Sequence, residues 1–168
     1  MLGNVAGLRA RHDKTKFQIL NEETFAEIAI LIVLTESRLS DNHFDSEIQL
    51  HGYTSYRTDR ALGMKIRGVV TYVHNAFSAS MEVLATASNS YVEYHMLYII
   101  QLALTVITLY RPPDCPSNLL ISPLEEMKVK LNALSACLPN IILTGNFNLP
   151  TVDWNCESVY GGSIDNKL

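Results

Sequence analysis

The chain has 168 residues, of which 48% are hydrophobic and 18% are charged, and its formal net charge is -4. This composition is typical of one globular domain with a sizeable apolar core, and it excludes an intrinsically disordered chain. The net negative charge gives no overall signature of nucleic-acid binding, so any contact with DNA would require a local basic surface.

The cysteines and apolar runs predict neither a zinc site nor a membrane anchor. Cys115, Cys137 and Cys156 are odd in number and widely spaced, without a CxxC or Cys/His cluster, so we expect no zinc site and a reducing compartment. The first residues lack the apolar segment of a secretory signal. The apolar runs at residues 28–34 and 97–110 are too short or too interrupted for a bilayer span, which needs ~20 apolar residues.

The first expected elements are a helix and a buried strand. Residues 14–28 place apolar side chains at roughly helical spacing, which predicts a helix of a few turns. Residues 28–35, IAILIVLT, form a continuous apolar run that fits a central strand buried on both faces. Glu36 follows this strand directly, where a carboxylate can serve either as a solvated strand end or as a ligand for a hard cation.

A basic cluster occupies the next part of the chain. We define it as Arg57, Arg60, Lys65 and Arg67, with Asp59 as its acidic neighbour. It could hold DNA phosphates or belong to a solvated loop, and composition alone favours neither. The strands expected around it are residues 47–50, 53–60, 68–74, 81–85 and 91–98, with a loop at 75–81.

The last expected elements are two strands and the helix between them. Residues 99–109 form a long β-branched run that prolines terminate, and residues 117–137 have the three-four spacing of an amphipathic helix. Residues 140–144 form a short buried strand that ends in Thr-Gly. The two asparagines that follow, Asn146 and Asn148, fit either an Asx-type turn or a site at the end of a strand.

Four segments together resemble one known family. LTESRL, YTSYRTDR, YRPP and LTGNFNLPTVDW resemble motifs of the endonuclease/exonuclease/phosphatase superfamily, and most closely the endonuclease domain of LINE-type (non-LTR) retrotransposons. The resemblance implies an incomplete α/β sandwich. Residues 1–168 would form a single partial domain that lacks the C-terminal strands and the segment with the catalytic His.

The resemblance also implies roles for individual residues. Asn4 and Glu36 match the metal site, with Mg²⁺ as the expected cofactor. Tyr110 and Asn148 match residues that orient or stabilise the phosphoryl group. Asn146 stands where the family has an Asp that orients and deprotonates the nucleophile. An amide cannot take up a proton at neutral pH, and loss of general-base work typically costs ~10²–10⁴ in rate.

The family usually has Gly where this chain has Arg67, so a positive φ at that position would strain the arginine. DNA is the expected partner, the basic cluster the expected contact, and a nuclear or cytoplasmic location the expected one. An exposed sheet edge is expected to favour self-association. Three hypotheses remain open: a degenerate retrotransposon endonuclease with little or no activity, a non-catalytic nucleic-acid-binding remnant, and a phosphoesterase of another branch of the superfamily.

Overall fold

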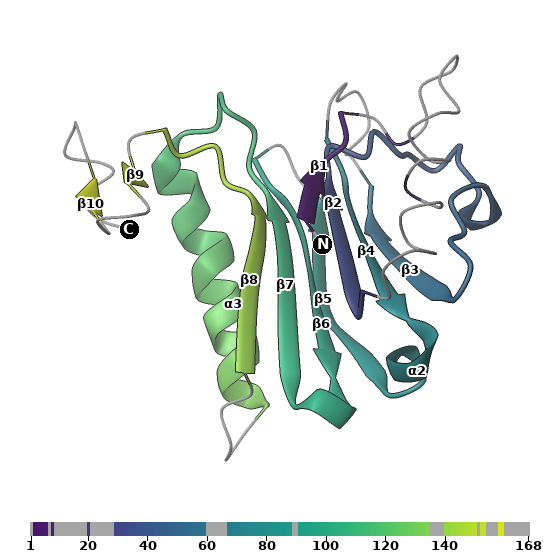
Figure 1. Ribbon diagram of the computed structural model, residues 1–168. Helices are drawn as coiled ribbons and strands as arrows, with labels where there is room; N and C mark the ends of the chain where they lie inside the picture. Colours follow the sequence, from purple (N-terminus) through teal and green to yellow (C-terminus); the bar gives the residue numbers. More distant parts are fainter. Residues whose placement is uncertain are drawn as a thin grey trace.

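Two facing β-sheets form the body of the structure, a computed structural model (Figure 1). The structure describes residues 2–6, 8, 20, 29–59, 67–88, 91–134, 140–150, 152–153 and 158–159. In this part of the chain, one sheet has the strand order β1-β2-β4-β3 and the other has the order β5-β6-β7-β8. Helix α3 lies along the second sheet (Figure 1). No described helix is long and apolar enough to cross a membrane.

The elements have the following bounds. The strands of the first sheet are β1 (Leu2–Asn4), β2 (Leu31–Thr35), β3 (Tyr53–Thr58) and β4 (Val69–His74). Those of the second are β5 (Met81–Ser88), β6 (Glu93–Ile99), β7 (Leu104–Tyr110) and β8 (Asn140–Asn146). A separate pair comprises β9 (Val152–Asp153) and β10 (Ser158–Val159). The helices are η1 (Asp45–Glu47), α2 (Asn75–Ser78), η2 (Ile100–Leu102), η3 (Ser117–Leu120) and α3 (Ile121–Ala133).

Each sheet contains one parallel pair, and these pairs position the site. β1 pairs in parallel with β2, so Asn4 lies opposite Thr35. β7 pairs in parallel with β8, so Tyr110 lies opposite Asn146. Because parallel strands end at the same edge of their sheet, each pair delivers the residues that follow it to one place.

The apolar core has two layers around the second sheet, because alternate residues of a strand point to opposite faces. One face of β7 turns Ile107 and Leu109 toward η3 and α3, where they pack with Leu120 and Met127. Between the sheets lies an apolar cluster of Val73, Leu97, Ile99 and Val106.

The rest of the space between the sheets holds a buried polar network. Thr71 Oγ1 is 2.7 Å from His95 Nε2 and 2.7 Å from Thr108 Oγ1. Thr58 Oγ1 is 3.2 Å from His95 Nδ1 and donates to the Tyr94 carbonyl. This arrangement assigns the imidazole proton to Nδ1, which donates to Thr58, while Nε2 accepts from Thr71. Burial lowers the pKa of His95 to about 3, so the ring is neutral.

The structure corrects the strand expected at residues 47–50. Asp45–Glu47 forms the short helix η1, whose first turn is capped by the Glu47 side chain. Ile48 and Leu50 are buried while the residue between them is exposed. This alternation imitates a strand, although the segment pairs with no strand in the described part of the chain.

The continuous strand expected at residues 99–109 is also wrong. β6 ends at Ile99, η2 turns the chain, and β7 begins at Leu104, which lies opposite Ile99. Ala103 adopts the left-handed conformation, with φ of 44°, at this reversal. Apolar residues fill most of the turn, so the hydrophobic pattern hides it.

Smaller differences concern element ends. The loop expected at residues 75–81 contains α2, and the strand expected to stop at residue 85 continues to Ser88. The helix expected over residues 117–137 begins as η3 and, as α3, ends at Ala133. β8 lies at the edge of the described sheet and is largely exposed, whereas we expected it to be buried. The helix expected at residues 14–28 lies outside the described residues, apart from Leu20.

Candidate functional site

The candidate site lies where β2, β7 and β8 end. Tyr110 and Asn146 are the last residues of neighbouring parallel strands and lie opposite each other. Glu36 follows β2 in the facing sheet. Asn146 Nδ2 lies 3.5 Å from Glu36 Oε1, a long hydrogen bond between residues 110 positions apart. This contact connects the two sheets at the strand ends.

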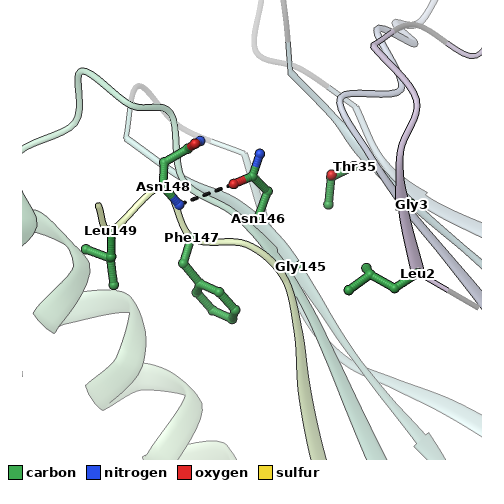
Figure 2. A pocket seen from close by; sticks show the side chains of 8 residues that line it. All are labelled: Leu2, Gly3, Thr35, Gly145, Asn146, Phe147, Asn148 and Leu149. Atoms are coloured by element: carbon green, nitrogen blue, oxygen red, sulfur yellow. Dashed lines mark hydrogen bonds between the residues drawn. The ribbon is translucent and has the colours of Figure 1, made fainter. Parts of the chain in front are cut away.

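The two asparagines of the loop are bonded to each other and to the end of β7. The backbone N–H of Asn148 donates to Asn146 Oδ1 at 3.2 Å, the bond drawn in Figure 2. Asn148 Nδ2 donates to the Arg111 carbonyl at 2.6 Å. The loop therefore holds Asn146 in one orientation, with its oxygen toward Asn148 and its amide nitrogen toward Glu36.

Arg111 also holds the loop that contains Asn146 and Asn148, a role that was not predicted. Its guanidinium is buried and donates to the carbonyl oxygens of Phe147 (3.1 Å), Asn148 (2.5 Å) and Cys115. Its backbone N–H donates to the Asn146 carbonyl at 2.9 Å. A planar guanidinium suits such a set of acceptors better than the ammonium of Lys. The sequence signal was a charged residue between an apolar strand and two prolines.

Gly145 allows β8 to approach β7 closely. Its φ is +139°, and a Cβ at this position would lie 1.8 Å from the Leu109 carbonyl oxygen. Any side chain would therefore push the two strands apart or distort the backbone. The glycine brings Asn146 alongside Tyr110.

Left-handed backbone occurs at several residues around the site. Glu36 has φ of 57° and Asn148 has φ of 46°. Arg38, two residues after Glu36, has φ of 58°, and Ala6, two residues after Asn4, has φ of 45°. For residues other than glycine this conformation costs about 1–3 kcal/mol each and tends to cluster at functional sites. Arg67 is not strained in this way, because the positive φ before β4 falls on Gly68, at 99°.

A buried carboxyl group, Glu93, lies beside Tyr110. Glu93 is fully buried and is opposite Tyr110 on neighbouring antiparallel strands. Burial raises the pKa of Glu93 to about 7, opposed by Arg67, whose guanidinium Nη1 lies 3.7 Å from Oε1, and by the Gly68 N–H. Neither contact makes a hydrogen bond of standard geometry. Burial, and then the charges of Glu36 and Glu93, raise the pKa of Tyr110 to about 12.

A cavity of about 360 Å³ opens beside the loop. Figure 2 shows the Asn146 side chain between those of Asn148 and Thr35, with Leu2 and Phe147 below them. The cavity is lined by Leu2, Gly3, Thr35, Gly145, Asn146, Phe147, Asn148 and Leu149. Glu36 and Tyr110 are outside this lining, so its polar side chains are those of Thr35, Asn146 and Asn148.

The basic cluster is only partly described. Arg57 forms ion pairs with Asp45 and Asp59, both at 3.2 Å. Asp45 was not anticipated, because it lies 12 residues before Arg57 in a segment expected to be a polar loop. Arg67 is buried beside Glu93. Arg60 and Lys65 lie outside the described residues, and so does the side chain of Asn4.

The donors among the described residues do not by themselves fit a divalent cation. Within the described ranges, no three His, Cys, Asp or Glu side chains are close enough to hold a metal ion. Glu36 supplies one carboxylate, and the group facing it is the N–H of an amide rather than a second oxygen ligand. Hard cations prefer several oxygen ligands in a fixed arrangement, so the expected Mg²⁺ is not matched by these residues.

No protein-family model and no curated protein sequence matches the chain. Solved structures do match. The AP endonuclease LMAP from Leishmania major has a TM-score of 0.60 and 18% identity, over 96% of this chain and 57% of that chain. An AP endonuclease from Archaeoglobus fulgidus has a TM-score of 0.57 and 15% identity, over 89% of this chain and 57% of that one.

A third similar structure is the endonuclease domain of TRAS1, a telomere-specific non-LTR retrotransposon. It has a TM-score of 0.54 and 14% identity, over 99% of this chain and 67% of that chain. The present chain spans 57% of the length of either AP endonuclease. The matches and the motifs agree, and the chain has the α/β sandwich fold of the endonuclease/exonuclease/phosphatase superfamily.

Proposed function

We propose that this chain is an endonuclease-like domain of a non-LTR retrotransposon in which the hydrolysis of DNA phosphodiesters is impaired or lost. The contact between Glu36 and Asn146 carries the proposal. It joins the LTESRL and LTGNFNLP motifs at the ends of strands in two different sheets, where α/β folds build their sites.

The chain retains groups that can bind a phosphate. The raised pKa of Tyr110, about 12, keeps its phenol protonated at neutral pH, so the O–H can donate to a phosphate oxygen. Asn148 is held by its bonds to Asn146 and Arg111, and the second hydrogen on its Nδ2 is then a fixed donor that can stabilise developing charge. DNA is the proposed substrate, as the resemblance implies.

The chain lacks a proton acceptor at position 146, where the family has an Asp. Asn146 has an amide there, and an amide cannot remove a proton from water. The general base is typically worth ~10²–10⁴ in rate. No step is assigned to Mg²⁺, because the described donor set does not fit it.

The retrotransposon branch is favoured by the YRTDR and YRPP segments. A non-catalytic DNA-binding remnant is less well supported. Arg57 is already paired with two aspartates and Arg67 lies beside Glu93, so these members of the basic cluster offer little free charge to phosphates.

Nicking of supercoiled plasmid, with Mg²⁺ and with EDTA, tests the proposal. We expect no Mg²⁺-dependent nicking by the unmodified chain or by Asn146→Asp alone. The resemblance implies that the catalytic His is also lacking, and restoring one of two catalytic groups that act as a unit gains little. Asn146→Asp in a chain extended by a related domain's C-terminal segment should nick, and Glu36→Ala should abolish that gain. Robust nicking by the unmodified chain that Glu36→Ala removes would refute the loss of activity. Absence of nicking by the extended variant would refute the family function.

A further inference from the structure

We propose that the Asn146 amide takes the place of a divalent cation at Glu36, so that the site is stable without metal and opposes metal binding. The inference rests on the proposed function in one respect: it takes Glu36, which Asn146 contacts, as a residue with which related phosphodiesterases bind their cation. It concerns the stability of the site and does not require activity.

The orientation of the Asn146 side chain is determined by its neighbours. The backbone N–H of Asn148 can only donate, so the atom 3.2 Å from it must be Oδ1. Nδ2 is then the atom 3.5 Å from Glu36 Oε1. The Glu36 carboxylate therefore faces the positive end of the Asn146 amide dipole. This N–H group occupies a position at the carboxylate where a cation could otherwise bind.

A cation at Glu36 would have to displace this contact. The displaced N–H would lose its acceptor in a partly buried site, and leaving a donor unpaired is unfavourable. Among the described residues the cation would gain one carboxylate in return, whereas a hard cation prefers several oxygen ligands.

A carboxylate at position 146 would reverse this balance. Two negative groups at about the present separation repel each other, and a bound cation or a proton relieves the repulsion. The surrounding backbone is held independently, since Arg111 binds the carbonyls of Phe147 and Asn148. Asn146→Asp therefore changes the charge of the site with little change in its shape.

The test compares thermal unfolding, followed by circular dichroism, in EDTA and in increasing Mg²⁺ or Mn²⁺. The Tm of the unmodified chain should be the same in all conditions. Asn146→Asp should have a lower Tm in EDTA, and its Tm should rise by about 3–5 °C for each tenfold increase in cation above its Kd. Adding Glu36→Gln to this variant should remove the rise. Asn75→Asp is the matched control, because Asn75 is exposed and its Oδ1 acceptor for Thr54 is kept.

The outcomes are distinct. A cation-dependent rise in the Tm of the unmodified chain that Glu36→Gln removes would overturn the proposal. An Asn146→Asp chain that responds no more than Asn75→Asp would also overturn it. If Asn146→Asp is unfolded in EDTA, recovery of a cooperative transition with cation supports the proposal, and failure to recover at any concentration contradicts it. The nicking assay reports separately on the proposed function, since the extended variant can fail to nick while Asn146→Asp still binds cation.

Discussion

Glu93 and Tyr110 lie directly opposite each other on antiparallel strands, so a fully buried carboxyl group shares one face of the sheet with the candidate catalytic phenol. Directly opposite side chains have Cβ atoms about 4.5–5.5 Å apart. The pair lies between the two sheets, and Tyr110 is level with Asn146, the last residue of the neighbouring strand β8. The charge on Glu93 therefore acts on the site without contact with the loop.

Glu93 should make the stability of the fold depend on pH. Its pKa is about 7 in the folded chain, above its usual 4.5, so the folded state holds a proton that the unfolded state releases. This contribution is fully present below pH 4.5 and is lost as the pH rises through 7. It amounts to on the order of 3 kcal/mol.

Glu93→Gln removes this contribution and keeps the shape of the side chain. Urea unfolding of both chains between pH 5 and pH 8 should show that the free energy of unfolding of the unmodified chain falls with pH relative to that of the variant. His95 gives the opposite trend. Its pKa in the folded chain, about 3, is below its usual 6.5, so the free energy of unfolding rises with pH between these two values. This rise is common to both chains. Parallel profiles would show that Glu93 is charged in the fold.

Thr71→Val tests the buried polar network. The substitution keeps the volume of the side chain but removes the hydroxyl bonded to His95 and Thr108. Leaving His95 Nε2 unpaired in the interior should lower the free energy of unfolding by about 1–3 kcal/mol. Thr54→Val is the matched control on the neighbouring strand, since its hydroxyl makes an exposed bond to Asn75 and its loss should cost less than about 0.5 kcal/mol. Equal effects of the two substitutions would mean that the network adds nothing to stability.

Arg111 should determine the rigidity of the asparagine loop. Arg111→Lys keeps the charge but cannot reach the carbonyls of Phe147, Asn148 and Cys115 together. We expect a loss of about 2–4 kcal/mol of stability, because hydrogen bonds to charged groups are worth about 1.5–3 kcal/mol each and some are replaced. Hydrogen exchange at the Asn148 amide should accelerate more than exchange in β6.

Arg38→Lys provides the comparison for that substitution, because Arg38 is exposed. Its effect on stability should stay within about 0.5 kcal/mol. Unchanged exchange at Asn148 in Arg111→Lys would show that the loop is held by other contacts.

The sequence predicted where β2 ends, and it placed the ends of β7 and β8 within two residues. Continuous apolar runs mark β2 and β8, and Glu36 and Asn146 stand where these runs meet polar residues. Such signals are local, so they can be recognised in the sequence without knowing how the strands pair. The contact between Glu36 and Asn146 itself required the family resemblance, because the residues are 110 positions apart.

Contacts that depend on register were not predictable. The pairing of Glu93 with Tyr110 follows from the turn at Ala103, which the apolar run around it conceals. The bonds of Arg111 depend on the turn after the two prolines, and the ion pair of Arg57 with Asp45 depends on the position of η1. In each case the contact depends on how segments distant in the sequence pair or pack, which local sequence patterns do not determine.

The edge strand β8 should cause self-association. Ile141, Ile142 and Leu143 are 46%, 44% and 45% exposed, and β8 has no partner on its outer side in the described part of the chain. Apolar edge strands without charges invite pairing with another chain. Ile141→Lys combined with Leu143→Lys should shift the chain toward monomer in sedimentation velocity, because charged edges oppose strand addition. Val129→Lys is the matched control, since Val129 is 66% exposed but lies on α3. The prediction fails if the unmodified chain is already a monodisperse monomer, or if Val129→Lys lowers association as much as the β8 variant.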